Sequence, residues 1–162
     1  MPEIDLARFV DVHDDVERAL EEIRAGRKQT HWMWFVFPQV AGLGRSDMAH
    51  RYAIRSLDEA AAFLTHPALG SDYVRIVEEV WCQVVERGVT IHAMFGSPDD
   101  AKLVSSLTLF AGVVRRLDVP GPTLTTFVTR AEDILEAASA QGFERCTTTE
   151  AFLRQDGRRS PG

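Results

Sequence analysis

Apolar residues recur at spacings of three and four along most of this 162-residue chain, which is the periodicity of an amphipathic helix. The N-terminal stretch shows the pattern, with apolar positions that end at a glycine: Leu6, Phe9, Val10, Val16, Leu20, Ile23 and Gly26. The pair Asp14-Asp15 leaves open whether this stretch is one helix or two. Only residues 31–37 and 88–95 have strand-like content. The sequence therefore predicts a mainly α fold of about six to eight helices with at most a minor β element.

Serine and proline residues mark where the later helices begin. Ser46 is a typical N-cap for a helix through about residue 55, and Ser56 opens a capping box for a short helix through about residue 65. Pro67 suits the first turn of a longer helix that ends near residue 88. The stretch Ser97-Pro-Asp-Asp100 starts a helix that runs to about residue 116, with acids in the first turn where the helix dipole favours them.

The length of the chain is the natural size of one domain, which buries roughly 70% of its unfolded surface. After a Pro-Gly-Pro break at residues 120–122, residues 123–128 are consistent with a short helix or a strand, and residues 131–140 with a helix. The end of the chain lacks apolar residues after Leu153. We therefore predict a single compact helical domain over residues 1–146 and a flexible C-terminal tail over residues 147–162.

The chain shows no signals for export or for a membrane. Its start is acidic and has no apolar block behind a basic one, so no secretory signal is predicted. The longest run without a charged residue, residues 29–44, is too short and too polar to span a bilayer. Cys82 and Cys146 are far apart in the sequence and match no metal or redox spacing. We expect a cytoplasmic protein with reduced thiols and no membrane partner.

Charge is distributed unevenly along the chain. The formal net charge of −6 argues against non-specific nucleic-acid binding. Residues 1–23 nevertheless carry eight acids and two bases, whereas residues 24–55 carry six bases and one acid. Because the basic segment is also the most aromatic one, this pattern favours a small anionic ligand with a flat ring over a long polyanion. The alternative is that the basic residues simply flank a core element.

Residues 31–37, His-Trp-Met-Trp-Phe-Val-Phe, concentrate aromatic side chains just after Lys28. Trp32 or Trp34 is predicted to stack on a ligand ring, with Lys28 assisting in the binding of its anionic group. His31 could serve as an acid/base or as a hydrogen-bond donor to the ligand. The alternative assigns the aromatic residues to a buried core element and His31 to an ordinary structural role.

A glycine-spaced turn, Gly42-Leu-Gly44-Arg45-Ser46, precedes a predicted helix. Gly42 and Gly44 would let the backbone approach a ligand closely, and free N–H groups at the helix start would attract phosphate together with Arg45 and Ser46. The turn matches neither a Rossmann fingerprint nor a Walker loop. The alternative is an ordinary tight loop in which Ser46 is a routine N-cap.

The helix that starts near residue 97 carries polar residues beside its apolar stripe. Asp99, Lys102 and Ser106 share one flank, with Ser105 beside them, and this flank could line the wall of a cleft. The alternative is a solvated face with a weak Asp-Lys pair. The five histidines show no metal-ligand spacing, so the sequence predicts no metal site and no cofactor.

Three long stretches together resemble one bacterial family, the domain of unknown function 1810: GRKQTHWMWFVFPQVAGLGRS, AHRYAIRSLDEAAAFLTHPALG and FGSPDDAKLVSSLTLF. The resemblance covers about residues 4–116 and, more loosely, the helix after residue 123. Members often carry the label calpastatin, but calpastatin is a disordered protease inhibitor, whereas this sequence has the apolar content of a full core. The resemblance implies a compact, mainly helical fold and supplies no established reaction.

The order of an aromatic segment, an Ala-rich helix and a later polar helix is more distantly similar to NADAR-type proteins. Those are small N-glycosidases that act on ADP-ribose-like or nucleotide-like substrates. Their pattern has a glutamate beside the aromatic segment and a later Asn-x-Leu-Gly word, and this sequence has neither. No catalytic residue is therefore transferred from that family.

Taken together, the sequence predicts binding of a small anionic, nucleotide-like or ribosyl-phosphate ligand. If the protein is an enzyme, hydrolysis of an N-glycosidic bond is the predicted class, with Asp99 as the carboxylate and His31 as the second catalytic residue. The alternative function is a non-enzymatic interaction module, such as a homodimer, because the aromatic residues exceed what one helical core needs.

Overall fold

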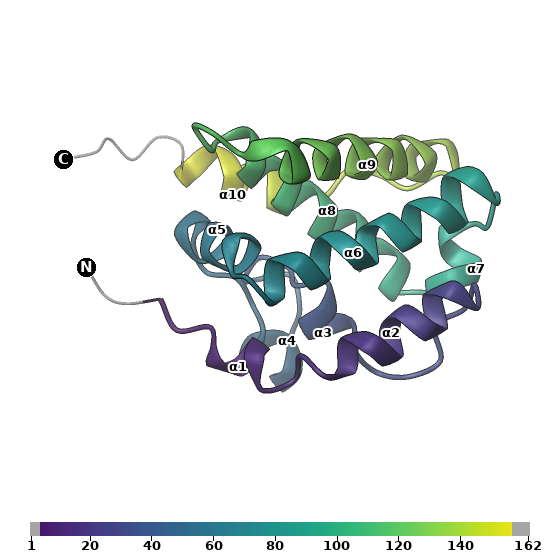
Figure 1. The fold of residues 1–162 in the computed structure, drawn as a ribbon, viewed down its shortest axis with the longest axis horizontal. Coiled ribbons are helices and arrows are strands. Elements are labelled where there is room, and N and C mark those ends of the chain that lie inside the picture. Colours follow the sequence, from purple (N-terminus) through teal and green to yellow (C-terminus); the bar gives the residue numbers. More distant parts are fainter. Residues whose placement is uncertain (1–3, 157–162) are drawn as a thin grey trace.

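The computed structural model describes residues 4–156, and Figure 1 shows that this part of the chain is built from helices. The elements are α1 (Ala7–Val10), α2 (Asp15–Arg24), α3 (Met33–Val36), α4 (Asp47–Arg51), α5 (Leu57–Thr65), α6 (Leu69–Trp81), the π-helical turn η1 (Cys82–Glu86), α7 (Ile91–Phe95), α8 (Asp99–Arg115), α9 (Gly121–Ala140) and α10 (Thr147–Asp156). Within residues 4–156 the only β feature is a single parallel bridge between Val40 and Ile54. The predicted mainly α class is confirmed.

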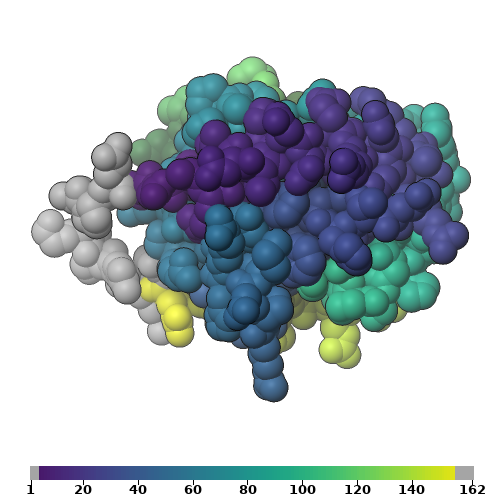
Figure 2. Space-filling model, turned by 90° about the horizontal axis from the view of Figure 1, so that it is seen from below, coloured from purple at the N-terminus to yellow at the C-terminus, as the bar shows by residue number. Residues whose placement is uncertain are grey.

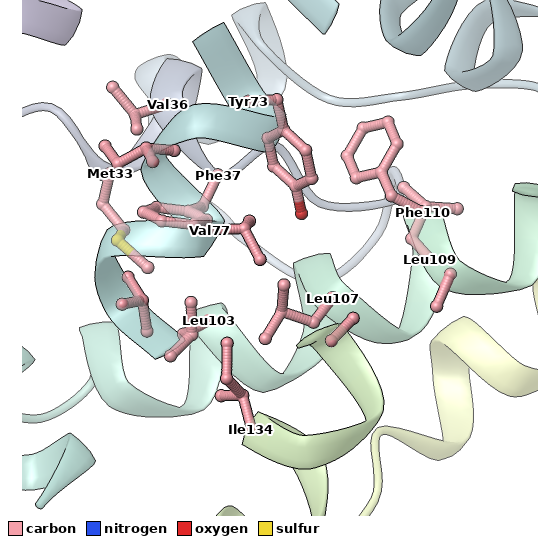
Figure 3. Close-up of a cluster of buried hydrophobic side chains, with 14 of the residues drawn as sticks. Met33, Val36, Phe37, Tyr73, Val77, Leu103, Leu107, Leu109, Phe110 and Ile134 are labelled. Atoms are coloured by element: carbon pink, nitrogen blue, oxygen red, sulfur yellow. The ribbon is translucent and has the colours of Figure 1, made fainter. Parts of the chain in front are cut away.

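Helix α8 is the centre of the fold. It packs against α5, α7, α9 and α10, while α6 crosses over it and packs against α2, α5 and α9. Most of its residues are buried, including Leu103, Leu107 and Phe110, so the helix has apolar neighbours on several sides. Figure 3 shows these side chains meeting Phe37, which follows α3, and Tyr73 of α6. The start of α8 is thereby held rigidly beside the aromatic segment.

Two predicted helix starts are confirmed in atomic detail. The Ser46 hydroxyl accepts the backbone N–H of Ala49 at 3.1 Å, and the Ser56 hydroxyl accepts that of Glu59 at 3.0 Å. The helix after Ser46 ends at Arg51 rather than near residue 55. The backbone after it turns inward because the Ile54 N–H donates to the Gln39 carbonyl at 2.8 Å.

The segments with strand-like content, 31–37 and 88–95, contain the short helices α3 and α7 instead. Their branched and aromatic side chains are buried against helices, and no strand within the described residues could pair with them. Residues 123–128 lie inside α9, which runs without a break from Gly121 to Ala140. The short-helix and strand interpretations of that segment are both replaced by one long helix.

The predicted tail begins too early, because residues 147–156 form helix α10 and dock on α8. Leu153 fits over Gly112, where a Cβ atom would lie 2.6 Å from the leucine Cδ1. Arg116 donates to the Leu153 carbonyl at 3.0 Å. The most buried residues of this helix are Leu153 and the polar Thr149, so the apolar periodicity that identifies longer helices was absent. The rest of the predicted tail, residues 157–162, lies outside the described residues.

None of the helices between residues 4 and 156 is long and apolar enough to cross a membrane.

Candidate ligand-binding site

The aromatic segment after Lys28 builds the core of the protein. Trp32 is 1% exposed and Phe37 is fully buried, and their rings lie 6.2 Å apart between centroids. Trp34 is half-buried and His31 is exposed. Of the two alternatives predicted for stacking on a ligand, Trp32 or Trp34, the Trp32 indole is enclosed by other side chains. Of the two tryptophans, only Trp34 reaches the surface.

A buried carboxylate that the sequence analysis did not identify fixes the start of this segment. Glu22 of α2 accepts the backbone N–H of Gln29, the backbone N–H and hydroxyl of Thr30, and the indole N–H of Trp32 at 3.1 Å. Burial by itself would raise the pKa of Glu22, but these hydrogen bonds outweigh it and hold the pKa below the usual 4.5. The aromatic segment is thus tied to α2 from inside the molecule.

Two lysines meet at Asp99, in the first turn of α8. Lys28 Nζ lies 3.0 Å from Asp99 Oδ2, and Lys102 Nζ lies 3.3 Å from Asp99 Oδ1. Lys102 Nζ also lies 5.6 Å from the ring centroid of Trp34. The structure therefore brings four of the sequence-predicted site residues together, and we call Lys28, Asp99 and Lys102 the lysine cluster.

Backbone contacts explain why two distant segments meet there. The backbone N–H of Lys28 donates to the Met94 carbonyl at 2.7 Å, which joins the segment after α2 to the end of α7. In Figure 2, dark-blue residues of the segments that follow α2 lie beside teal-green residues from around α7 and the start of α8.

A groove of about 460 Å³ lies beside the lysine cluster, between the glycine turn and the first half of α8. Gly44, Arg45 and Ser46 of the turn line it together with Lys102 of α8. We call it the Arg45 groove. The two predicted ligand-binding segments thus border the same space, and Lys102 belongs to both the groove and the lysine cluster. His31, Trp34, Asp99 and Lys28 do not line it.

Local packing accounts for most of the glycine turn. Gly42 has a φ of +98° and lies outside the groove. A Cβ atom at Gly44 would collide with the Cβ of Ala49, so close packing on α4 requires the glycine. Ser46 is engaged as the N-cap of α4. Arg45 is different: it is exposed, and no carboxylate among residues 4–156 lies within ion-pair distance of it.

The predicted serines of α8 are buried. Ser106 is fully buried, and its hydroxyl is 2.9 Å from the Tyr73 hydroxyl. It cannot reach a ligand because it faces α6, so its predicted binding role is wrong. Ser105 is 2% exposed but borders the groove, with its hydroxyl 3.1 Å from that of Thr149 in α10. The Thr149 hydroxyl in turn donates to the Cys146 sulfur at 3.0 Å.

The two residues of the predicted catalytic pair have different partners. Each carboxylate oxygen of Asp99 lies beside an ammonium group, and the Asp99 side chain is 20% exposed. His31 is exposed, and its ring is 6.4 Å from that of Trp34. In the described part of the chain, no cluster of three His, Cys, Asp or Glu residues could hold a metal ion.

A second, larger groove of about 750 Å³ lies among α8, the end of α9 and α10. Its floor includes Leu135, Phe143 and Leu153, and its rim carries four arginines and four glutamates. This balanced rim offers no net charge for an anionic ligand. The sequence analysis missed the groove because it treated residues 147–156 as a tail.

Comparison with known proteins shows the family of the chain. A family model described as "Protein of unknown function (DUF1810)" matches residues 3–138. Among solved structures, the chain is similar to the conserved hypothetical protein Rv1873 from Mycobacterium tuberculosis, with 42% sequence identity and a TM-score of 0.65. That match covers 85% of this chain and 96% of the other. No curated protein matches the chain.

Proposed function

The chain belongs to the DUF1810 family of proteins of unknown function, and from this premise we propose that its Arg45 groove binds a small anionic ligand of the nucleotide or ribosyl-phosphate class. The observation that carries the proposal is the exposed Arg45, which has no ion-pair partner among residues 4–156 and shares the groove with Lys102. Two cations that line one groove suit a phosphate group.

The size and lining of the groove support a small ligand. Its volume of about 460 Å³ lies within the range of small-molecule sites. Leu43 and Val104 supply apolar surface for a ring or sugar face, and Gln39 and Glu144 supply polar groups that can bind hydroxyls. Trp34 lies behind Lys102 rather than on the groove wall, so it supports the lysine and does not stack on the ligand.

Binding, rather than catalysis, is the function that this geometry supports. Hydrolysis of an N-glycosidic bond stays a prediction, because it needs a carboxylate directed at the substrate and Asp99 is held by two lysines. The interaction-module alternative loses its main support, since the aromatic residues that suggested it are mostly core residues. Trp81 is half-buried: Arg130 lies over its ring, and its indole donates to Asp133 at 2.9 Å.

Isothermal titration with AMP and ribose 5-phosphate tests the proposal. Arg45→Ala should leave folding nearly unchanged and weaken binding by about 1.5–3 kcal/mol, the scale of a hydrogen bond to a charged group. Arg18→Ala removes the same charge from an exposed position on α2 and should bind like the wild type. Equal affinities of the two variants, or no binding to the wild type, would contradict the proposal.

A further inference from the structure

We propose that Asp99 is an internal stand-in for the ligand's anionic group, and that Lys102 leaves Asp99 and turns to a phosphate when the Arg45 groove is filled. The inference rests on the proposed function of that groove. Asp99 then does not act on the ligand: its carboxylate competes with the ligand for the ammonium group of Lys102. The affinity for the ligand then depends on how much stronger the Lys102–phosphate pair is than the Lys102–Asp99 pair that it replaces, and not on the ligand's contacts alone.

The choice of residue types supports this role. The chain contains sixteen arginines but only two lysines, and both lysines meet at Asp99. An ammonium group is a compact charge on a flexible stem, whereas a guanidinium group is a planar fork that fixes two partners. A cation that exchanges one oxygen anion for another is better served by lysine.

The two lysines are held very differently. The Lys28 side chain is 8% exposed, and its Nζ donates to the Thr30 carbonyl at 2.6 Å and lies 5.1 Å from the ring centroid of Trp32. These contacts keep Lys28 on Asp99 whether or not a ligand is bound. Because Lys28 remains, the partly buried Asp99 carboxylate keeps a cationic partner when Lys102 departs.

Lys102 has the properties of the exchangeable partner. Its side chain is 25% exposed, its distance to Asp99 is the longer of the two, and the pair spans one turn of the same helix. Ion pairs of this kind are weak. The residue already lines the groove, and the Trp34 face beneath it keeps a second favourable contact for the ammonium group.

Titration with ribose 5-phosphate tests the exchange. We expect Asp99→Asn to bind about two- to fivefold more tightly than the wild type, the range that corresponds to a partly exposed ion pair. Asp47→Asn is the matched control, because it removes one negative charge next to Ser46 from a residue with no ion pair within the described chain. The control should differ from the wild type by less than about 1.5-fold at physiological salt.

A second pair of variants tests whether Asp99 acts through Lys102. In a Lys102→Met background, adding Asp99→Asn should give no tighter binding than adding Asp47→Asn. If Asp99→Asn still tightens binding without Lys102, or if it matches Asp47→Asn in the wild-type background, the carboxylate acts only by general repulsion and the inference is overturned. In either case the proposed function survives, provided that the wild type binds.

NMR of the wild type supplies a readout that needs no substitution. Protein labelled with ¹³C-lysine should give two Cε resonances, one for each lysine. Ribose 5-phosphate should shift the Lys102 signal and leave the Lys28 signal in place. A shift of both signals, or of neither in a protein that binds, would overturn the exchange. No binding by the wild type or by Asp99→Asn would overturn the proposed function, and the exchange with it.

Discussion

Glu22 and Asp99 are two carboxylates that hold the same short segment, residues 28–32. Glu22 accepts hydrogen bonds from Gln29, Thr30 and Trp32, and Asp99 pairs with Lys28. The partners of Glu22 are neutral and belong to the backbone or the core, so they have no other anion to bind. The partners of Asp99 are ammonium groups, one of which lines a groove. The same chemical group is therefore a fixed structural anchor at one site and an exchangeable partner at the other.

Removing the Glu22 carboxylate is the most severe test of this contrast. Glu22→Ala leaves the N–H groups of Gln29 and Thr30 and the indole N–H of Trp32 without their acceptor. We expect the free energy of unfolding to fall by about 3–4 kcal/mol in urea titrations, since one buried donor and several partly buried donors lose their acceptor together. Glu21→Ala, the exposed neighbour, should change it by less than about 0.5 kcal/mol. Similar losses for both variants would show that Glu22 is not an anchor.

The Asp99 side of the contrast predicts unequal lysines. Lys28→Met removes a buried ion pair and the hydrogen bond to the Thr30 carbonyl, and should lower the free energy of unfolding by about 1–3 kcal/mol. The same substitution at Lys102 removes the weaker pair and is the matched control. If Lys102→Met costs as much as Lys28→Met, the two ammonium groups are equally fixed, and Lys102 is not the exchangeable one.

Acid should release the Glu22 anchor gradually. The pKa of Glu22 is lowered in the folded protein, so its contribution to stability is fully present above the usual value of 4.5 and is lost as the pH falls through the folded pKa. The loss should be smaller than that caused by Glu22→Ala, because a protonated carboxyl still accepts hydrogen bonds. The stability difference between the wild type and Glu22→Gln, measured from pH 7 to pH 3, should shrink only below pH 4.5. A constant difference would contradict this assignment.

The same contrast shows what could be predicted from the sequence. Ser46 and Ser56 revealed their helices because an N-cap is a local signal. Lys28 was selected because it precedes the aromatic segment, and Asp99 and Lys102 because they share one flank of a predicted helix. Glu22 was missed because it stands beside Glu21 in an acidic helix, and its partners depend on how the chain returns after Gly26. Trp32 and Ser106 were predicted to bind a ligand, although both are buried. The burial of an indole N–H or a hydroxyl depends on tertiary contacts, which the sequence does not show. Helix α10 buries Leu153 and the polar Thr149, so its sequence shows no apolar periodicity.

The smallest expected effect is the response of Lys102→Met to salt. This response distinguishes the partly exposed ion pair of Asp99 from the buried hydrogen bonds of Glu22. The Lys102–Asp99 pair should contribute about 0.3–1 kcal/mol to the free energy of unfolding at low ionic strength. In 1 M NaCl the screening length falls to about 3 Å, so the difference between the wild type and Lys102→Met should nearly vanish. The Glu22→Ala difference should persist in the same buffer, because buried hydrogen bonds are screened much less. If salt abolished the stability differences of both Lys102→Met and Glu22→Ala, or of neither, the partly exposed Asp99 and the buried Glu22 would not differ in their screening by salt.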